Sequence, residues 1–366
     1  MRIRRLQLQP FRNIDSLELD LGVRGALIIG DNGRGKSNIL EAISYLSLGK
    51  SIRGARDHEA VPHDGTWFDI RGAWEVGEQE HQARVVYSGQ DGKRVFMDGA
   101  PLPRVSDLVS QFQTVHFAPE DVALVLQFSA QRRRLLDILL SQAVPAYLQN
   151  LQRYNRVLTQ RNHFLRQLGQ RRADPAERGV WDGQLTEPGA AIRRARMEAL
   201  VEIAPVLSSC YSGFSTGRER AGIEYQGVEL TADGDDVPSL DAVQEILLQE
   251  LRADPTKEER AGHTLSGPHR DSVGFTLDDS PAETYGSQGQ LKSVLLSWKM
   301  AESRFLESRS GHQPVLLLDD VFSELDETRS RQLLLLADDF EQVVLTTPRV
   351  PSQGMPSRFE HIELSS

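Results

Sequence analysis

The segment from Gly30 to Ser37 has the residue types and spacing of a phosphate-binding loop. Its residues are Gly30, Asp31, Asn32, Gly33, Arg34, Gly35, Lys36 and Ser37. They fit the pattern of glycine, four residues, glycine, lysine and then serine or threonine. Backbone N–H groups wrap the phosphates, Lys36 is expected to reach the β and γ phosphates, and the Ser37 hydroxyl is expected to ligate Mg²⁺. We expect Lys36 to face solvent when no nucleotide is bound.

Two adjacent acids follow an apolar segment near the other end of the chain. Residues Pro314 to Leu318 are apolar and lead directly to Asp319 and Asp320. Burying an unpaired carboxylate at a strand end is costly unless a cation or hydrogen-bond donors accompany it. With a phosphate-binding loop upstream, the pair predicts that Asp319 holds Mg²⁺ directly or through water and that Asp320 orients or deprotonates the attacking water.

Two further segments resemble the signature and the D-loop of ABC-type ATPases. The first, Gly286 to Gln290, opens a helical pattern, and the second, Ser323 to Asp326, follows the acid pair. Free N–H groups at the helix start would form a second anion site. The resemblance implies that this site faces the γ-phosphate of another subunit, so that two ATP molecules lie between two heads. The residues implied here are Ser287, Gln288, Gly289 and Gln290, with Ser287 joining Lys36 and Asp320 as catalytic candidates.

The elements that must position these segments are strands and helices in alternation. Strands are expected at Met1–Gln9, Asp15–Leu21, Ala26–Ile29, Trp67–Trp74, Gln82–Tyr87, Arg94–Met97, Val273–Leu277, Pro314–Leu318 and Gln342–Thr346. Helices with one apolar face are expected from Gly35 to Gly49, over Ser287–Phe305 and over Glu327–Ala337. This alternation predicts an α/β fold, an ABC-type P-loop ATPase head whose mixed sheet includes an antiparallel meander.

A compact helical lobe is expected to interrupt the head. Helical patterns begin after Phe128, with Ser129 as a possible cap, continue from Val144 to Leu168, and return over Ala190–Leu207, with residues 170–188 as a polar connector. The predicted division is an N-terminal part of the head over residues 1–128, the lobe over 129–261 and a C-terminal part of the head over 262–366.

Charge is distributed unevenly along the 366 residues. The net charge of -10 argues, taken alone, against nucleic acid as a partner. Residues 130–196, however, contain 13 arginines, no lysine and five acids, so this segment carries +8 and the remainder -18. Blocks of opposite sign often mark regions with different partners. The segment therefore predicts a basic lobe that binds DNA, with a solvated helix face as the alternative. Arg132 to Arg134 are candidates for DNA contact, and a structural role suits them equally.

Composition limits the class of protein further. No run approaches the ~20 apolar residues of a membrane helix, and the start, which lacks an apolar core and a cleavage site, does not resemble a signal peptide. The single cysteine, Cys210, cannot form an internal disulfide. A cytoplasmic protein with no membrane contact is expected.

The chain resembles the RecF family of bacterial recombination mediators, ATPases related to the heads of structural-maintenance-of-chromosomes proteins. The match extends over nearly the whole length. The segments that carry it beyond the ABC motifs are Phe11–Asn13, Asn38–Ile43, Pro119–Asp121, Arg132–Asp137, Ser266–Asp271 and Asp319–Asp326. The resemblance adds Arg12 to the residues expected to bind the nucleotide.

Function and partners follow from this resemblance as expectations. It implies a weak DNA-stimulated ATPase that dimerises on ATP binding, binds gapped or junction DNA with single- and double-stranded parts, and promotes recombinase loading. RecR and RecO are the implied partners, with RecA as an indirect one. Thr346 and Thr347 stand where transporters carry a histidine, and His269 is either a turn-stabilising or a functional residue.

Two other classes share parts of the pattern. A transporter ATPase subunit would need far fewer than the 250 residues that separate Ser37 from Ser287. A P-loop kinase does not require Ser-Gln-Gly-Gln before the acid-pair strand. The response of the ATPase rate to duplex DNA, a lipid-embedded partner or a small acceptor molecule would discriminate among the three.

Overall fold

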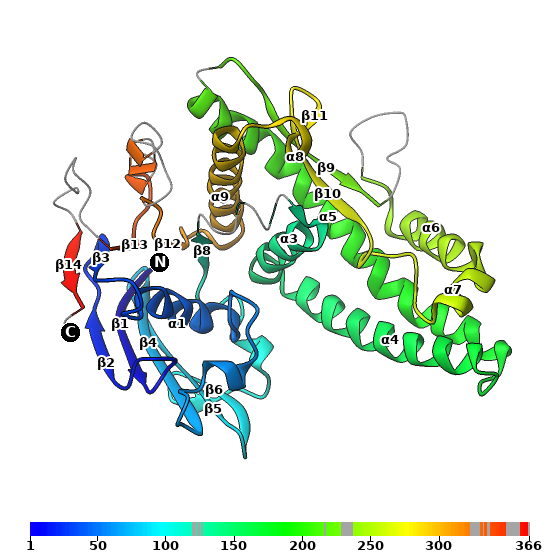
Figure 1. Cartoon of the computed structure of the whole chain (residues 1–366), viewed down its shortest axis with the longest axis horizontal. Helices are drawn as coiled ribbons and strands as arrows, with labels where there is room; N and C mark the ends of the chain where they lie inside the picture. Colours follow the sequence, from blue (N-terminus) through cyan, green and yellow to red (C-terminus); the bar gives the residue numbers. More distant parts are fainter. Residues whose placement is uncertain are drawn as a thin grey trace. The chain divides into compact units, whose positions relative to one another are not determined.

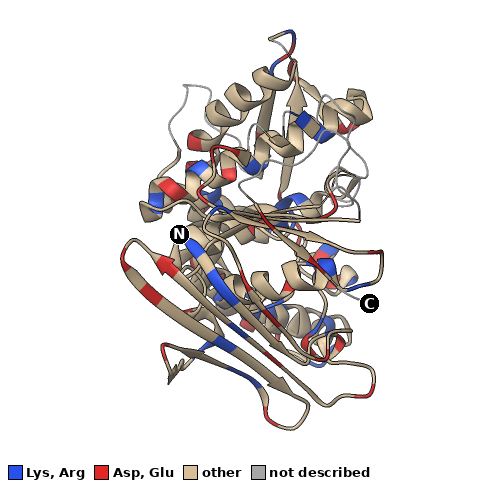
Figure 2. Cartoon of the chain, turned by 90° about the vertical axis from the view of Figure 1, so that its left-hand side faces the viewer, with Lys and Arg blue, Asp and Glu red and all other residues tan. Residues whose placement is uncertain are grey.

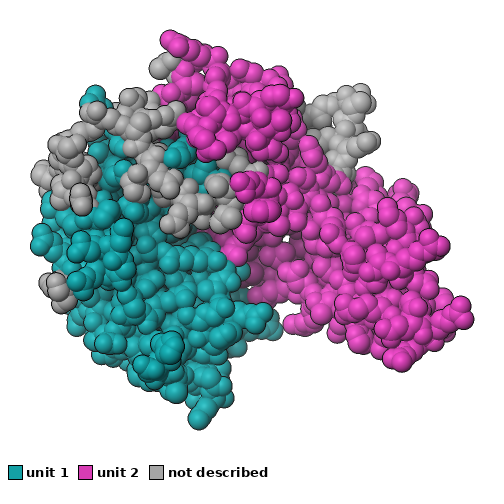
Figure 3. Space-filling model, viewed as in Figure 1, with its two compact units in different colours: residues 1–122, 292–366 teal, residues 123–291 magenta. Residues whose placement is uncertain are grey.

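The computed structural model describes residues 1–118, 122, 125, 127–215, 217–227, 237–322, 330, 331, 333, 334, 337–348 and 359–364. The chain folds into two compact units, which Figure 3 distinguishes by colour. Unit 1 comprises Met1–Val122 and Lys292–Ser366, and unit 2 comprises Ala123–Leu291. Each unit is described by itself below.

Unit 1 contains an antiparallel sheet of six strands in the order β2-β1-β4-β5-β6-β7 (Figure 1). Its strands are β1 (Arg2–Gln9), β2 (Leu17–Asp20), β4 (Trp67–Val76), β5 (Gln79–Ser88), β6 (Gly92–Met97) and β7 (Ala100–Pro101). Ser88 pairs with Gly92 where β5 turns into β6. The turn between these two strands is therefore a hairpin.

The second sheet of unit 1 is parallel and has five strands in the order β14-β3-β13-β12-β8. They are β3 (Gly25–Ile29), β8 (Thr114–Phe117), β12 (Val315–Leu318), β13 (Val343–Thr347) and β14 (Glu360–Glu363). Strands from the two ends of the chain thus lie side by side. Every residue of β8, β12 and β13 is buried, as expected for the interior of a parallel sheet.

Helix α1 (Lys36–Leu48) forms the core of unit 1 together with the two sheets. Its apolar residues Ile39, Leu40, Ile43 and Leu46 are fully buried and belong to one cluster with strands of both sheets. Gly49 ends the helix in a left-handed conformation with a φ of 64°. A glycine is favoured there because it has no Cβ to clash with the following carbonyl. The helix therefore carries the phosphate-binding loop between two layers of sheet.

Unit 2 is built on helices, which are α3 (Ser129–Ala143), α4 (Pro145–Gly169), α5 (Arg178–Ser215), α6 (Leu240–Ala253) and the short α7 (Pro255–Ala261). A small antiparallel sheet of β9 (Ala221–Gln226), β10 (Ser272–Leu277) and β11 (Ser280–Pro281) accompanies them. The short helix α8 (Ala282–Tyr285) leads to α9 (Gln288–Ser310), which continues across the boundary between the units.

Three features differ from the sequence expectations. Residues 262–291, expected in the head, belong to unit 2 because β10 pairs with β9. Helix α5 begins at Arg178, so part of the expected connector is helical, and it continues through Pro188 and Pro205. Ser129 is the first residue of α3 and not its cap, since Phe128 occupies the cap position without a side-chain hydrogen bond.

The expected helix over residues 327–337, the D-loop at 323–326 and the segment 119–121 lie largely or wholly outside the described residues. No helix in the described part of the chain is both long enough and apolar enough to cross a membrane.

Candidate nucleotide-binding site

The phosphate-binding loop has the backbone that its glycines predict. Gly33 and Gly35 have φ angles of 83° and 88°, which side chains with a Cβ rarely adopt. A Cβ on Gly35 would also lie 3.0 Å from Asn13 Oδ1. The Asn13 amide donates to the Gly33 carbonyl at 2.8 Å. The loop is therefore shaped both by its own glycines and by the turn that follows β1.

Lys36 is held inside the loop and does not face solvent. Its ammonium group donates to the carbonyl oxygens of Gly30 at 2.6 Å and Asp31 at 2.9 Å, and the residue is only 6% exposed. The expectation of a solvent-facing Lys36 was wrong because the loop carbonyls themselves solvate the cation. A phosphate would exchange these neutral acceptors for charged ones, which form stronger hydrogen bonds.

Asp319 and Ser37 meet, although 282 positions separate them in the chain. The Ser37 hydroxyl donates to Asp319 Oδ1 at 2.8 Å. The same oxygen accepts from the hydroxyl of Thr346 at 2.7 Å, at the end of the neighbouring strand β13. Asp319 is 6% exposed. A carboxylate beside a hydroxyl provides the hard oxygen ligands that Mg²⁺ prefers, so the residues present fit the predicted metal.

Arg53 is a site residue that the sequence reasoning missed. It lies in the loop after α1, its side chain is 41% exposed, and its guanidinium Nη2 is 3.1 Å from Asp319 Oδ2. A cation bound at Asp319 would therefore meet an arginine at the same carboxylate. The only signal in the sequence is a basic residue just after the helix of the loop, and nothing there indicates its partner.

Asp320, the predicted water-orienting residue, follows Asp319 in a left-handed conformation with a φ of 46°. Its backbone N–H donates to the Thr346 hydroxyl at 3.0 Å. Thr346 therefore contacts both acids, a role that its place in the sequence did not reveal. This hydrogen bond holds the Asp320 backbone at the end of β13.

Arg12, also predicted to contact the nucleotide, is engaged by protein groups. Its guanidinium donates to the buried carboxylate of Glu41 at 2.7 and 3.1 Å and to the Glu59 carbonyl at 2.6 Å. Glu41 additionally accepts from the Ser51 hydroxyl. These contacts place Arg12 against α1 and leave its side chain 21% exposed.

The signature-like segment lies in unit 2 and begins α9. The Ser287 backbone N–H donates to Gln290 Oε1 at 2.7 Å, and the Gln290 N–H donates to the Ser287 hydroxyl at 3.3 Å. This reciprocal pair is a capping box, which satisfies two N–H groups at a helix start. Ser287 and Gln288 are exposed, and Gly289 and Gln290 are half-buried. The segment is thus an ordered, accessible helix N-terminus.

Several arginines of the basic segment have structural partners inside unit 2. Arg161, Arg193 and Arg196 are at most 2% exposed. Arg161 binds Asp182 and Glu258, and Arg193 binds Asp271 and Glu250. Removing one partner of a buried ion pair costs about 3–5 kcal/mol because the other charge is left uncompensated. These arginines hold the helices together and are not available to a ligand.

Arg132 and Arg133, offered above as candidates for DNA contact, are also used internally. Arg132 is 7% exposed and donates to the carbonyls of Val273 and Val125. Arg133 donates to the Asp271 carbonyl at 2.6 Å. The segment Ser266–Asp271 therefore receives bonds from α3 as well as α5, and it serves as a packing element of unit 2.

His269 within this segment has a structural position. Its Nε2 lies 3.2 Å from the Thr264 carbonyl, which can only accept, so Nε2 carries the proton and Nδ1 accepts from the Tyr154 hydroxyl at 2.7 Å. Burial lowers the pKa of His269 to about 4, although the hydrogen bond to Thr264 acts in the opposite direction.

Lowering the pH from 6.5 to about 4, which are the unfolded and folded pKa values of His269, should therefore reduce the stability of the chain. The unfolded chain binds the proton more readily, so protonation of His269 favours unfolding. This destabilising effect is absent above pH 6.5, where the imidazole is neutral in both states. About 3 kcal/mol should be lost across the window. Chemical denaturation at several pH values would measure it, with His269→Gln as the control. An unchanged slope in that variant would contradict the assignment.

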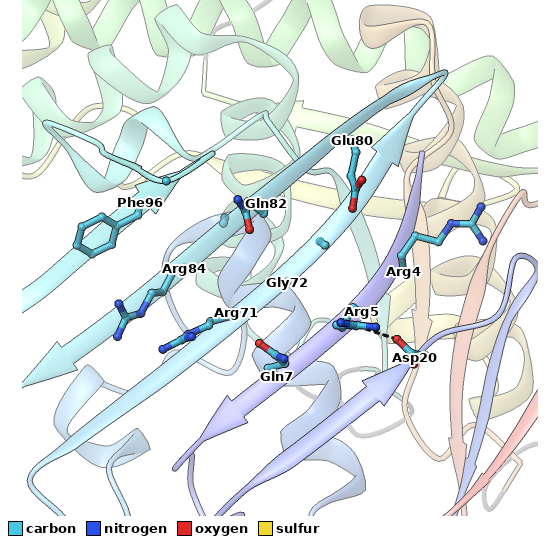
Figure 4. A pocket seen from close by; sticks show the side chains of 13 residues that line it. Arg4, Arg5, Gln7, Asp20, Arg71, Gly72, Glu80, Gln82, Arg84 and Phe96 are labelled. Carbon is cyan, nitrogen blue, oxygen red and sulfur yellow. Dashed lines mark hydrogen bonds and ion pairs between the residues drawn. The ribbon is translucent and has the colours of Figure 1, made fainter.

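The outer face of the antiparallel sheet carries a hollow of about 700 Å³ (Figure 4). Arg71 and Arg84, which line it, both bind the buried carboxylate of Asp69, and Arg5 binds Asp20. Figure 2 shows the two charge signs mixed on these strands. None of the lining residues belongs to the phosphate-binding loop or the acid pair, so we assign the hollow no part in nucleotide binding.

Among the described residues, no group of three or more His, Cys, Asp or Glu forms a metal site. A phosphate-binding loop, an acid pair that ends another strand of the same parallel sheet and a signature-like helix start define an ABC-type ATPase head.

Comparison with known proteins identifies the family. Residues 2–352 match the RecF/RecN/SMC N terminal domain. A protein from Heliobacterium modesticaldum named DNA replication and repair protein RecF is 39% identical over 348 residues, covering 95% of this chain and 92% of that protein. The Bacillus subtilis protein of the same name is 35% identical over 351 residues, covering 96% and 94%. The chain belongs to the RecF family of DNA replication and repair proteins.

Solved structures agree with this assignment. A structure described as the recombination mediator protein RecF-ATPrS in the RecFOR pathway has a TM-score of 0.87 and 29% identity, and it covers 98% of this chain and 94% of that one. An SMC head bound to a domain of ScpA, at 14% identity and a TM-score of 0.53, shares the fold. The predicted family, the ABC-type fold with an inserted helical lobe and the ATPase class are confirmed.

Proposed function

We propose that this chain is an ATP-switched DNA-binding protein of recombinational repair. It binds ATP and Mg²⁺, dimerises with ATP between two heads, binds gapped or junction DNA and promotes recombinase loading, and slow hydrolysis resets it. The observation that supports this proposal is the contact of Ser37, Asp319 and Thr346, which brings residues from both ends of the chain together beside the phosphate-binding loop.

The roles of the site residues follow from their positions. Lys36 and the N–H groups of the loop hold the phosphates, and Ser37 and Asp319 hold Mg²⁺, which neutralises phosphate charge when bound. Mg²⁺ and the Arg53 guanidinium would share Asp319, so the half-exposed arginine would have to release that carboxylate for the metal. Asp320 orients the attacking water, and Ser287 meets the γ-phosphate held by the partner head.

DNA contact is proposed for the outward side of α4. The helix contains no acidic residue, and its exposed positions include Arg153, Arg156, His163 and Arg166. In the described part of the chain, neither Arg156 nor Arg166 has an ion pair, whereas Arg153 binds Glu187 at 2.7 Å. Spacings of three and seven residues place such side chains along one side of a helix. This stripe replaces the buried arginines as the candidate for binding the DNA backbone.

Sedimentation of the full chain tests the function as a whole. With ATP the chain should form a dimer, and gapped DNA should sediment with that dimer and not with the nucleotide-free monomer. A chain that stays monomeric with ATP, or that binds DNA equally without ATP, would contradict the proposed switch. RecR and RecO, the partners proposed from the family, would be added to the DNA-bound dimer.

Replacing Arg153, Arg156 and Arg166 together by glutamine should weaken DNA binding and flatten its salt dependence. Each neutralised phosphate contributes a slope of about -0.9 to the logarithm of affinity against the logarithm of salt concentration. Fluorescence anisotropy over a salt series measures both quantities. Arg94→Gln, at a 64% exposed residue of unit 1 paired with Asp91, is the matched control. Unchanged affinity and slope in the triple variant would remove DNA contact from α4.

A further inference from the structure

Tyr285 is a large apolar side chain that the fold leaves uncovered. It is 74% exposed, the highest value among the large hydrophobic residues of the described chain, and Val180 follows at 59%. Tyrosine carries a large apolar area, which usually finds a packing partner. Its exposure is therefore a reason to look for a surface that covers it.

The residues around Tyr285 have the composition of an interface centre. The segment Thr284–Gln290 contains no charged residue, whereas charged residues make up 26% of the chain. Thr284, Ser287 and Gln288 are exposed as well. Interface centres are depleted of charge and enriched in tyrosine. An uncharged, exposed segment with a protruding aromatic residue is therefore typical of a surface that a protein partner covers.

The segment is also held in one conformation before any partner arrives. The Gly286 N–H donates to the carbonyl of the buried Ala282 at 2.8 Å. The side chain of Gln290 bonds Ser287 at one end and Glu219 at 2.7 Å at the other. A Cβ on Gly286 would lie 2.7 Å from Leu291. A surface that is ordered in advance loses little entropy on binding.

We propose that Tyr285 is an anchor of the contact between two copies of this chain. The inference rests on the proposed ATP-dependent dimer and adds to it an apolar anchor beside the signature-like segment. Two residues of extended chain span at most about 7 Å, so Tyr285 stands close to Ser287. A partner head that brings its nucleotide to Ser287 therefore also covers the ring of Tyr285.

Twofold symmetry makes the expected effect large. In a symmetric dimer each chain contributes the same surface, so one substitution removes two contacts. Truncation of an anchoring tyrosine typically weakens binding by tenfold or more. We expect Tyr285→Ala to weaken ATP-dependent dimerisation by about 100-fold. Tyr285→Phe, which keeps the ring, should dimerise like the wild type.

The test measures dimerisation and nucleotide binding separately in the full chain. Sedimentation over a concentration series with ATP gives the dimer dissociation constant, and titration of dilute monomer with a fluorescent ATP analogue gives nucleotide affinity. Phe128→Ala, which removes a 52% exposed aromatic residue elsewhere in unit 2, is the matched control. Ser287→Arg, which places a bulky cation at the signature-like segment, should block dimerisation and serves as the positive control for loss of the dimer.

The possible results distinguish a failure of the Tyr285 anchor from a failure of the proposed ATP-dependent dimer. If the wild type stays monomeric with ATP, the proposed dimer fails. If the wild type dimerises and Tyr285→Ala has the same dissociation constant, or loses monomer affinity for ATP to the same extent, the anchor is overturned. Hydroxyl-radical oxidation gives a direct readout, because ATP should protect Tyr285 only at concentrations at which the dimer forms. Protection at monomer concentrations would also overturn the inference.

Discussion

Lys36→Met should abolish ATP-dependent dimerisation and ATP hydrolysis while leaving the fold intact. In the structure the Lys36 ammonium bonds two loop carbonyls and points into the cradle that would hold the phosphates. Methionine has a similar length but no charge, so the phosphates lose their closest cation. Charge-assisted hydrogen bonds contribute about 1.5–3 kcal/mol each, and each 1.4 kcal/mol changes an affinity tenfold. We expect nucleotide affinity to fall by at least 100-fold.

Two measurements check this result. Binding of a fluorescent ATP analogue gives the affinity, and thermal unfolding without nucleotide shows whether the fold is retained. Because Lys36 is buried, Lys36→Arg serves as a second variant that keeps the charge and changes its geometry. A Lys36→Met chain that dimerises with ATP at the wild-type concentration would show that Lys36 does not hold the phosphates.

The second large effect concerns the two acids, whose substitutions should have different consequences. Asp320→Asn keeps size and hydrogen bonding but removes the negative charge that orients or deprotonates water. It should bind ATP, dimerise and hold DNA while hydrolysing ATP at least 100-fold more slowly, the scale that general-base removal gives. Many ABC ATPases have glutamate here, and the shorter aspartate predicts slow turnover in the wild type as well.

Asp319→Asn should instead weaken Mg²⁺-dependent nucleotide binding itself. Asp319 accepts from Ser37, Thr346 and Arg53, so a neutral amide loses charge where the metal and the arginine both bind. Phosphate release and dimer lifetime, measured at several Mg²⁺ concentrations for both variants, test whether Asp319 binds the metal and Asp320 orients the water. Wild-type hydrolysis by the Asp320→Asn chain would require a different base. Equal Mg²⁺ dependence of the two variants would argue against Asp319 as the metal ligand.

Local patterns in the sequence were sufficient to predict the phosphate-binding loop and the helix that follows it. Glycine spacing determines which backbone conformations are possible, and apolar spacing determines which side of a helix is buried. Gly35, Lys36 and the end of α1 at Gly49 could therefore be placed from neighbouring residues alone. The parallel sheet was also predictable, because the sequences of β12 and β13 are mostly apolar and do not alternate with charged residues, as is typical of strands buried on both faces.

The partners of charged side chains could not be predicted, because they come from distant parts of the chain. The basic segment was expected to be a ligand surface, yet Arg161 and Arg193 bind acids that lie up to 97 positions away and are buried with them. Composition counts charges but does not show which of them packing removes from water. Exposure, which decides whether an arginine is free for DNA, is a property of the folded unit.

At the nucleotide site, too, the contacts between distant parts of the chain could not be predicted from the sequence. Arg53 and Thr346 flank Asp319 only because the loop after α1 and the end of β13 meet the end of β12. Lys36 was expected to face solvent when no nucleotide is bound, whereas the curled loop presents two carbonyls to it. The sequence by itself determined which residues have the chemistry to bind a nucleotide. Only the tertiary structure decided which groups stand around them, since strand order and loop curvature set those distances.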